Sequence, residues 1–546
     1  MLSWRSLWPP TVITGLLSMD WPNDAGFQAT AECREPVELP VTGSIPWQIA
    51  GTLFRVGPGT YKVAGSKYQL SHWFDGFTYL YRFQLVAQPT GTCRVLYSSR
   101  RQVDRLVEEA RKSGTLEGIT FWPETRSMCE HFPEGQKFLS SLVQYQRPGI
   151  PGVPPHLKSS DPLAGVRQFH SLTTITDANI LKGVDPETLE PIGITREDAL
   201  HPELRGPLSC AHASLDPTTG DLFNYNLDLG RYATYRVFRT SAATGQTDIL
   251  ATISGPTVKP AYLHSFFLCP DYVILCIWPC IFGAAGVKIL WERKMVDAMR
   301  FDSNIQTRWY VVDRKQNRGV VATFLSPAFF RFHTINAWQT DNGDGTVDIM
   351  CDIIQYPTDE MIRRAYYESM VSTGSDVEKY FGSEASRPSL VRYRLPSMPK
   401  DSRVELPTND AIIPQADILL KIEGEGVGDL PTINSCFASK KTRYVYDVVN
   451  QGKSSFFDGI AKVDLETQKV LIWSHDHHTP GEAVFVPDGA NAAEDAGYLL
   501  SIVLNGGTGT SYLLCLNARD MTEVGRADCA AAVGFGFHGT HYPFRQ

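Results

Sequence analysis

The sequence lacks most of the short motifs that reveal a function directly. Its 546 residues contain no CxxC pair, no P-loop and no HExxH motif. A zinc ribbon, a dithiol redox centre, a phosphate-binding loop and a zincin site are therefore not indicated. The net charge is −8 and no long basic block is present, which argues against nucleic-acid binding.

Disulfide frameworks and linkers are missing as well. The eleven cysteines are scattered singly and their number is odd, so we expect a reducing, intracellular and cytoplasmic location. No Ser- or Gly-rich linker divides the chain, which predicts a single domain over residues 1–546. Residues 1–25 contain only short apolar runs, interrupted by Pro9 and Pro10. They are expected to form a flexible or membrane-surface arm.

Long hydrophobic runs are limited to the stretch between Tyr272 and Trp291. Pro279 and Gly283 interrupt it, so a strand at Val273–Ile277 is favoured over a membrane-spanning helix. Cationic residues follow, and apolar side chains beside them suit peripheral binding to an anionic membrane. The alternative is a core strand followed by a solvated helix. The predicted membrane patch comprises Ile277, Trp278, Ile281, Phe282 and Trp291.

Strand patterns dominate the sequence that is present. The turn 342–345 (NGDG) precedes a predicted strand at Thr346–Ile353. Further strands are expected at 221–228, and as hairpins at 459–465/469–473 and 498–504/511–516. Helical patterns occur only at 103–113 and 359–370. Many short strands with regular turns are typical of a large all-β sandwich, barrel or propeller.

Four of the thirteen histidines lie in apolar or aromatic surroundings: His212, His264, His333 and His538. Each by itself is typical of a hydrogen-bonded core histidine, and no short spacing joins them as metal ligands. A second group, His475, His477 and His478, could place two imidazoles on one strand face to bind zinc. An exposed polar turn is the favoured interpretation of that group.

Ordered segments over most of the chain resemble the carotenoid cleavage oxygenases. This family includes carotenoid- and apocarotenoid-cleaving enzymes, stilbene-cleaving enzymes and the retinoid isomerohydrolase. The matching segments are GTLFRVGPG (51–59), HWFDGF (72–77), AHASLDPTTGDLF (211–223), YLHSF (262–266), FHTINAW (332–338), DLPTIN (429–434), GEAVFVP (481–487) and GFHGT (536–540). The resemblance implies an all-β, seven-bladed β-propeller, with loops and short helices forming a cap over the iron-bearing face.

The resemblance also implies a metal site. It identifies His212, His264, His333 and His538 as ligands of one Fe(2+), a metal that imidazole suits. It places Asp177, Asp429 and Glu482 behind the ligands, where carboxylates orient imidazole rings. Two of these three are aspartate where the family commonly has glutamate. The shorter side chain predicts either a closer backbone or a bridging water.

The implied function is oxidative cleavage of a C=C double bond by O2. Thr176 matches the near-iron threonine of carotenoid-type members and favours a carotenoid or apocarotenoid, such as torulene or a β-apocarotenal. Tyr97 falls near a tyrosine of stilbene cleavers, which keeps a resveratrol-type substrate open. A non-catalytic lipid-binding propeller is a further alternative. The aromatic residues proposed to line a substrate tunnel are Phe74, Tyr97, Phe332, Trp338 and Phe537.

Overall fold

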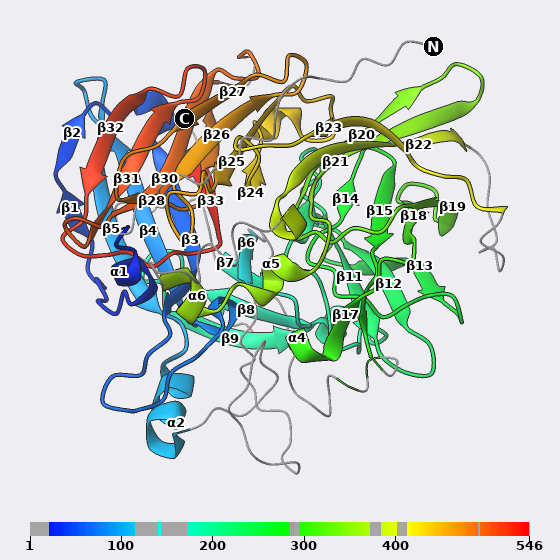
Figure 1. Cartoon of the computed structure of the whole chain (residues 1–546), viewed down its shortest axis with the longest axis horizontal. Helices are drawn as coiled ribbons and strands as arrows, with labels where there is room; N and C mark the ends of the chain where they lie inside the picture. Colours follow the sequence, from blue (N-terminus) through cyan, green and yellow to red (C-terminus); the bar gives the residue numbers. More distant parts are fainter. Residues whose placement is uncertain are drawn as a thin grey trace.

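Antiparallel strands are the main regular secondary structure of the residues that the structure describes. The computed structural model describes residues 21–114, 140–143, 172–283, 286, 288, 295–371, 384–400, 412–489 and 492–544. Within these ranges the strands form seven sheets of at least four strands, and one two-stranded sheet. The larger sheets are arranged around a common centre (Figure 1). The predicted seven-bladed β-propeller is therefore confirmed.

The first three blades hold the N-terminal third and the C-terminus. The first contains β1 (Val37–Leu39), β3 (Gly51–Thr60), β4 (Phe77–Ala87), β5 (Cys93–Arg101) and β33 (His538–Pro543). The second contains β6 (Ser140–Val143), β7 (Leu172–Thr176), β8 (Ile180–Val184) and β9 (Pro191–Arg196). The third contains β10 (Ser214–Leu215), β11 (Leu222–Asp228), β12 (Thr234–Thr240) and β13 (Thr247–Ser254).

The next two blades hold the middle of the chain. The fourth contains β14 (Phe267–Leu268), β15 (Tyr272–Ile277), β18 (Thr307–Asp313) and β19 (Val320–Ser326). The fifth contains β20 (Thr334–Asp341), β21 (Thr346–Gln355), β22 (Ser389–Pro399) and β23 (Asp417–Ile422). The separate pair is β16 (Cys280–Phe282) and β17 (Met299–Phe301).

The last two blades complete the ring. The sixth contains β24 (Asp429–Thr432), β25 (Tyr444–Val449), β26 (Gly459–Asp464) and β27 (Val470–Trp473). The seventh contains β2 (Val41–Gly43), β28 (His478–Pro480), β29 (Val484–Pro487), β30 (Gly497–Asn505), β31 (Thr510–Asn517) and β32 (Glu523–Asp528).

The ring is closed by an exchange of strands between the two ends of the chain. The N-terminal β2 pairs with β32 in the seventh blade, while the C-terminal β33 pairs with β3 in the first. Figure 1 shows the blue β2 beside the red β32. Both pairings are antiparallel ladders, so opening the ring between these blades would break backbone hydrogen bonds on both sides.

The strands form where turn chemistry and apolar pattern agree. Before β21, Gly343 and Gly345 adopt left-handed φ values of 79° and 87°, which favour glycine. The two predicted hairpins are present as β26–β27 and β30–β31, and the predicted strand at 221–228 is β11. β15 is buried at every position, which explains its unbroken apolar run.

Helices are few and short: α1 (Asp24–Phe27), α2 (Asp104–Ser113), α4 (Met295–Ala298), α5 (Glu360–Arg363) and α6 (Tyr367–Val371). α2 confirms the predicted helix at 103–113. The single helix predicted at 359–370 is wrong, because α5 and α6 are separate. Between them the backbone pairs with residues 71–73: Tyr367 donates to Ser71, and Trp73 donates to Ala365. No described helix has the length and apolarity to cross a membrane.

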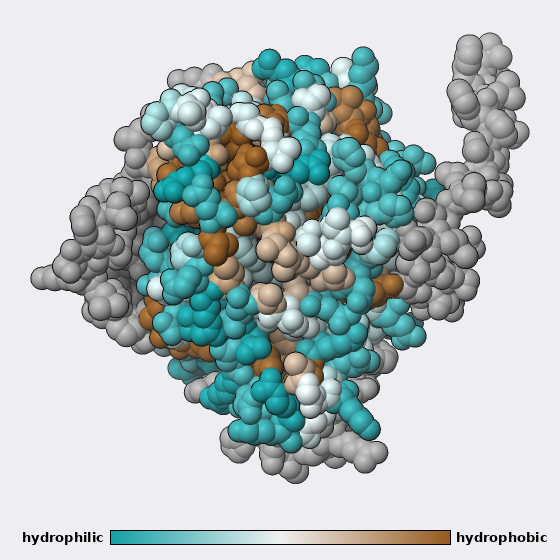
Figure 2. Space-filling model, turned by 90° about the vertical axis from the view of Figure 1, so that its left-hand side faces the viewer, coloured by the Kyte–Doolittle hydropathy of each residue, from teal (hydrophilic) through white to brown (hydrophobic). Residues whose placement is uncertain are grey.

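The predicted membrane patch is wrong for most of its residues. Ile277, Trp278 and Phe282 are 5%, 0% and 0% exposed, and only Ile281 is half-buried. Trp291 lies outside the described residues. The same apolar pattern is expected for a surface patch and for a buried strand, and here Ile277, Trp278 and Phe282 belong to the main hydrophobic core. Figure 2 shows one side of the molecule, where hydrophilic side chains predominate around smaller hydrophobic areas.

Two residues of the predicted N-terminal arm, Trp21 and Asn23, are buried against the propeller. Residues 1–20 lie outside the described part of the chain, but residues 21–25 are packed against the propeller. Trp21 is 2% exposed and its indole N–H donates to Thr479 at 2.9 Å. Asn23 donates to the Met370 carbonyl at 2.9 Å. These buried contacts fix the segment that leads into the first blade.

Candidate metal centre

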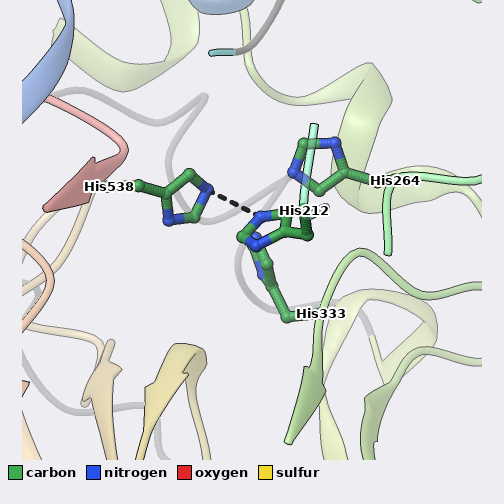
Figure 3. Close-up of side chains that lie close together, drawn as sticks. All are labelled: His212, His264, His333 and His538. Carbon is green, nitrogen blue, oxygen red and sulfur yellow. Dashed lines mark hydrogen bonds between the residues drawn. The ribbon is translucent and has the colours of Figure 1, made fainter. Parts of the chain in front are cut away.

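Four histidines that are far apart in sequence converge on one point. His212, His264, His333 and His538 each offer a ring nitrogen, and these four atoms lie within 4.8 Å of one another. His538 is the first residue of β33, and His212, His264 and His333 stand one to three residues before β10, β14 and β20. Each of these four strands lies at an edge of its sheet. Figure 3 shows the four rings gathered around a shared centre.

The inward nitrogens are placed to accept a metal ion. The Nε2 atoms of His264 and His333 are buried and have no hydrogen-bond partner. The Nε2 atoms of His212 and His538 face each other at 3.0 Å. Unpartnered buried polar atoms are uncommon in folded proteins, and a ligand is one explanation for them. An all-imidazole donor set fits a divalent first-row transition metal such as Fe(2+).

Burial favours the neutral form of His212 and His538, which is the form that binds a metal. Burial lowers the pKa of His212 well below its ordinary value, and the neighbouring histidines lower it further. Burial also lowers the pKa of His538 to about 4, although Glu482 opposes this shift. Protons therefore do not compete for the nitrogens of His212 and His538 near neutral pH.

Three buried carboxylates support three of the four rings. Nδ1 of His264 donates to Asp177 at 2.9 Å, Nδ1 of His333 to Asp429 at 2.6 Å, and Nδ1 of His538 to Glu482 at 2.9 Å. A proton held on Nδ1 leaves the lone pair of Nε2 pointing at the common centre. The aspartates make these contacts directly, without a bridging water.

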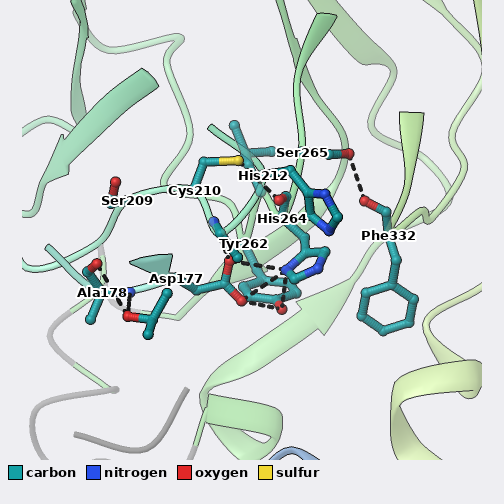
Figure 4. A network of polar contacts seen from close by, with 12 residues as sticks. Asp177, Ala178, Ser209, Cys210, His212, Tyr262, His264, Ser265 and Phe332 are labelled. Carbon is teal, nitrogen blue, oxygen red and sulfur yellow. Dashed lines mark hydrogen bonds and ion pairs between the residues drawn. The ribbon is translucent and has the colours of Figure 1, made fainter. Parts of the chain in front are cut away.

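Each carboxylate is itself held by a second donor. Tyr262 donates its hydroxyl to Asp177 at 2.8 Å, as Figure 4 shows, and Tyr356 donates to Asp429 at 2.7 Å. Glu482 instead pairs with Arg55 at 2.5 Å and accepts from the Gly539 backbone N–H. Burial opposes the charge on Glu482, but His538 and Arg55 hold the pKa of this carboxyl below its ordinary value.

Sequence reasoning did not identify these supporting donors. Tyr262 stands two residues before His264, a spacing that places both side chains on one face of an extended segment. Arg55 lies within the GTLFRVGPG segment, but nothing in that segment indicates its partner. No local sequence pattern identifies Tyr356 as a partner of Asp429, because the two residues are 73 positions apart.

Each of the seven blades supplies one of the four histidines or one of the three carboxylates that orient them. In chain order the second to seventh blades contribute Asp177, His212, His264, His333, Asp429 and Glu482, and β33 of the first blade contributes His538. The centre is therefore complete only when the ring closes.

Aromatic residues stand beside the histidines. The ring centroid of Phe332 lies 5.9 Å from that of His264, and Phe74 packs against both Phe332 and Phe537 at 5.6 and 5.4 Å. Phe537 lies 6.5 Å from His538. These three residues give the centre an apolar side. Their place in a substrate tunnel stays a prediction.

Two other predicted tunnel residues pack elsewhere. Trp338 lies under the Arg392 guanidinium, 4.7 Å from it, and Tyr97 packs against Phe83 in a separate core cluster. Their assignment to the tunnel is therefore wrong, since neighbouring strands cover them.

Thr176 directly precedes Asp177, and its hydroxyl accepts from the Ala178 backbone N–H at 3.1 Å. Its near-iron role stays a prediction.

The second histidine group does not form a comparable centre. His475 is exposed, and His478 contacts the Tyr512 hydroxyl at 2.7 Å through Nδ1. In the described ranges, the four-histidine group is the only set of three or more His, Cys, Asp or Glu placed to hold a metal.

Comparison with known proteins gives a consistent result. The family model described as retinal pigment epithelial membrane protein, RPE65, matches residues 26–543. A carotenoid dioxygenase of Neurospora crassa is 39% identical over 96% of this chain and 91% of its own length. A torulene dioxygenase of Fusarium fujikuroi is 38% identical over 96% of this chain and 94% of its own length.

Solved structures share the fold. A mutant of the Synechocystis apocarotenoid oxygenase superposes with a TM-score of 0.71, covering 95% of this chain and 98% of that one at 18% identity. A cobalt-substituted form of the same oxygenase superposes with a TM-score of 0.69, at 21% identity, covering 95% of this chain and 98% of that one. With the family model spanning nearly the whole sequence, the chain belongs to the RPE65 family, the carotenoid cleavage oxygenases.

Proposed function

We propose that this protein is an Fe(2+)-dependent dioxygenase that cleaves a C=C double bond of a carotenoid or apocarotenoid with O2. His212, His264, His333 and His538 would hold the iron. The observation that carries the proposal is the convergence of these four ring nitrogens within 4.8 Å.

The supporting residues have separate tasks in this proposal. Iron, when bound, supplies the activation of O2. Asp177, Asp429 and Glu482 keep a proton on the outer nitrogen of three rings, which fixes ring orientation. Phe74, Phe332 and Phe537 provide an apolar wall against which a polyene can lie, and they exclude water from the reacting double bond.

The substrate class rests on the relatives. Proteins 38–39% identical over nearly the whole chain carry the names carotenoid dioxygenase and torulene dioxygenase. We therefore propose torulene or a related linear carotenoid as the first substrate to test. A stilbene substrate loses its support, because Tyr97 lies in a core cluster away from the histidines.

Product identification tests the proposal. Purified, iron-loaded protein is incubated with torulene, a β-apocarotenal or resveratrol while O2 uptake is followed, and the products are separated by chromatography. Aldehyde products with matching O2 uptake from a polyene support it. Cleavage of resveratrol alone would overturn the substrate class. Failure of the purified protein to take up iron during loading would favour a lipid-binding propeller.

A polyene partitions into membranes, so we also propose peripheral membrane association in the cytoplasm. The buried residues of the predicted patch do not provide the contact, and Ile281 is its one half-exposed member in the described range. Sedimentation with anionic vesicles at low and high salt tests association, with Ile281→Glu as the variant. Sedimentation that does not rise above a vesicle-free control would remove the proposal.

A further inference from the structure

A buried arginine without a carboxylate partner stands beside the metal centre. Arg331 is 0% exposed and lies two residues before His333. In the described part of the chain no ion pair joins it to an acidic group, and its Nε has no hydrogen-bond partner. Its guanidinium lies 4.5 Å from the ring of Trp278 and 5.0 Å from that of Phe267.

Such a position is costly for a cation. Removing a guanidinium from water without a paired anion is unfavourable, and cation–π contacts offset only part of that cost. Arg331 makes two hydrogen bonds to Ser265, and its guanidinium also contacts the Cys276 thiol. One nitrogen donates to the Ser265 hydroxyl at 3.2 Å and another donates to its carbonyl at 3.2 Å.

The Ser265 hydroxyl joins the fourth and fifth blades beside the histidines. It donates to the Phe332 carbonyl at 2.6 Å, as Figure 4 shows, and it accepts from the Thr334 backbone N–H at 3.0 Å. With the bond from Arg331, this one hydroxyl uses its single proton and both lone pairs. The Thr334 hydroxyl adds a parallel bond to the Phe266 carbonyl at 3.2 Å.

The joined residues flank two of the four histidines. Ser265 directly follows His264, which leads into β14 of the fourth blade. Phe332 and Thr334 lie on either side of His333, which leads into β20 of the fifth blade. The contact therefore fixes the backbone of one predicted ligand relative to that of the next.

We propose that Ser265 and Arg331 are a positioning pair that sets the distance between the Nε2 atoms of His264 and His333. This inference rests on the proposed metal site. The carboxylates behind these histidines orient each ring but come from the second and sixth blades, so they do not tie the fourth blade to the fifth. The Ser265–Arg331 pair joins these two blades directly beside the histidines, at the residues next to His264 and His333.

Metal binding by purified full-length protein tests the proposal without any substrate. Metal-free protein is titrated with Co(2+) against a chelator, and the visible spectrum of the bound ion reports its geometry. The variants are Ser265→Ala, which removes the hydroxyl, and Arg331→Lys, which keeps the charge but loses the planar pair of donors. Ser265→Thr, which restores a hydroxyl, is the conservative rescue.

Matched controls separate positioning from general loss of packing. Ser326→Ala removes another fully buried hydroxyl, which accepts from Trp309 at 3.0 Å. Arg392→Lys alters another guanidinium that lies over a tryptophan, at 4.7 Å from Trp338. Neither residue contacts the four histidines, so both controls should bind Co(2+) as the wild type does. Thermal unfolding of the metal-free proteins gives the packing cost of every variant.

We expect Ser265→Ala and Arg331→Lys each to weaken Co(2+) binding by about 10- to 100-fold and to change the visible spectrum, with Ser265→Thr recovering most of the affinity. Affinity and spectrum that match the controls in both variants would overturn the proposal. If wild-type protein itself bound no Co(2+), the proposed metal site would fail instead, which distinguishes the two.

Discussion

The carboxylate of Asp177 accepts a hydrogen bond from His264 although the two residues come from blades that are not neighbours. Asp177 follows β7 of the second blade, and His264 precedes β14 of the fourth. The third blade, which carries His212, lies between them in chain order. The same carboxylate accepts from the Ala211 backbone N–H at 3.0 Å, so it supports the segment that leads to His212 as well. One aspartate thus holds two predicted ligands.

Replacing Asp177 with asparagine should therefore weaken metal binding more than a surface change. The amide keeps the size of the side chain but loses the charge that retains the proton on Nδ1 of His264. We expect a loss of about 10- to 100-fold in affinity for Fe(2+) or Co(2+), measured by competition with a chelator. Asp476→Asn, at an exposed position, is the control. Equal affinities in both variants would contradict the role of Asp177.

His264→Ala should abolish both bound iron and cleavage. Removing one of four ligands also leaves Asp177 with a buried charge and no histidine partner. Metal analysis of the purified variant and an O2-uptake assay measure the two effects. His475→Ala, from the second histidine group, should keep both properties because His475 is exposed. Iron retained at one ion per chain in His264→Ala would rule out this ligand.

Arg55→Met should destabilise the fold strongly. Arg55 and Glu482 are 2% and 9% exposed, and loss of the guanidinium leaves a buried charge without its partner. We expect the free energy of unfolding to fall by about 3–5 kcal/mol in denaturant titrations. Arg94→Met breaks an exposed pair with Glu38 and should cost no more than about 1 kcal/mol. Comparable losses of unfolding free energy in the two variants would contradict a larger contribution of the buried pair.

His72 should make the metal-free protein less stable in mild acid. Its Nε2 donates to the Ile362 carbonyl and its Nδ1 accepts from the Phe74 N–H, an arrangement that requires a neutral ring. Burial lowers the pKa of His72 from 6.5 to about 4. As pH falls from about 6.5 towards 4, His72 becomes protonated in the unfolded chain but stays neutral in the folded protein, so the free energy of unfolding decreases.

The size of that decrease is on the order of 3 kcal/mol, from the pKa difference at 1.36 kcal/mol per pH unit. His72→Gln keeps a neutral side chain and should flatten the pH dependence of unfolding by a comparable amount. Denaturant titrations at several pH values between 4 and 7 measure it. An unchanged slope in His72→Gln, with His475→Ala behaving as wild type, would exclude His72 as the cause.

Local sequence was sufficient for many strands and for the set of chemically important residues. The turn NGDG at 342–345 and the apolar alternation after it predict β21, because glycine favours the left-handed turn positions and alternation matches the strand period. The histidines and the three carboxylates followed from motifs that resemble a family. The spacing of the histidines along the chain carried no such signal.

Only the tertiary structure decided which residues meet. The apolar run at Ile277 and Trp278 is compatible with a surface patch and with a core strand. The structure shows that both residues are buried, which excludes them from a surface patch. Tyr356 and Arg331 became informative only through contacts across blades. The sequence by itself determined the strands, the turns and the donor atoms, because these depend on local chemistry. Closure of the ring decided the metal centre, because each blade contributes one residue and no two of them are joined by local spacing.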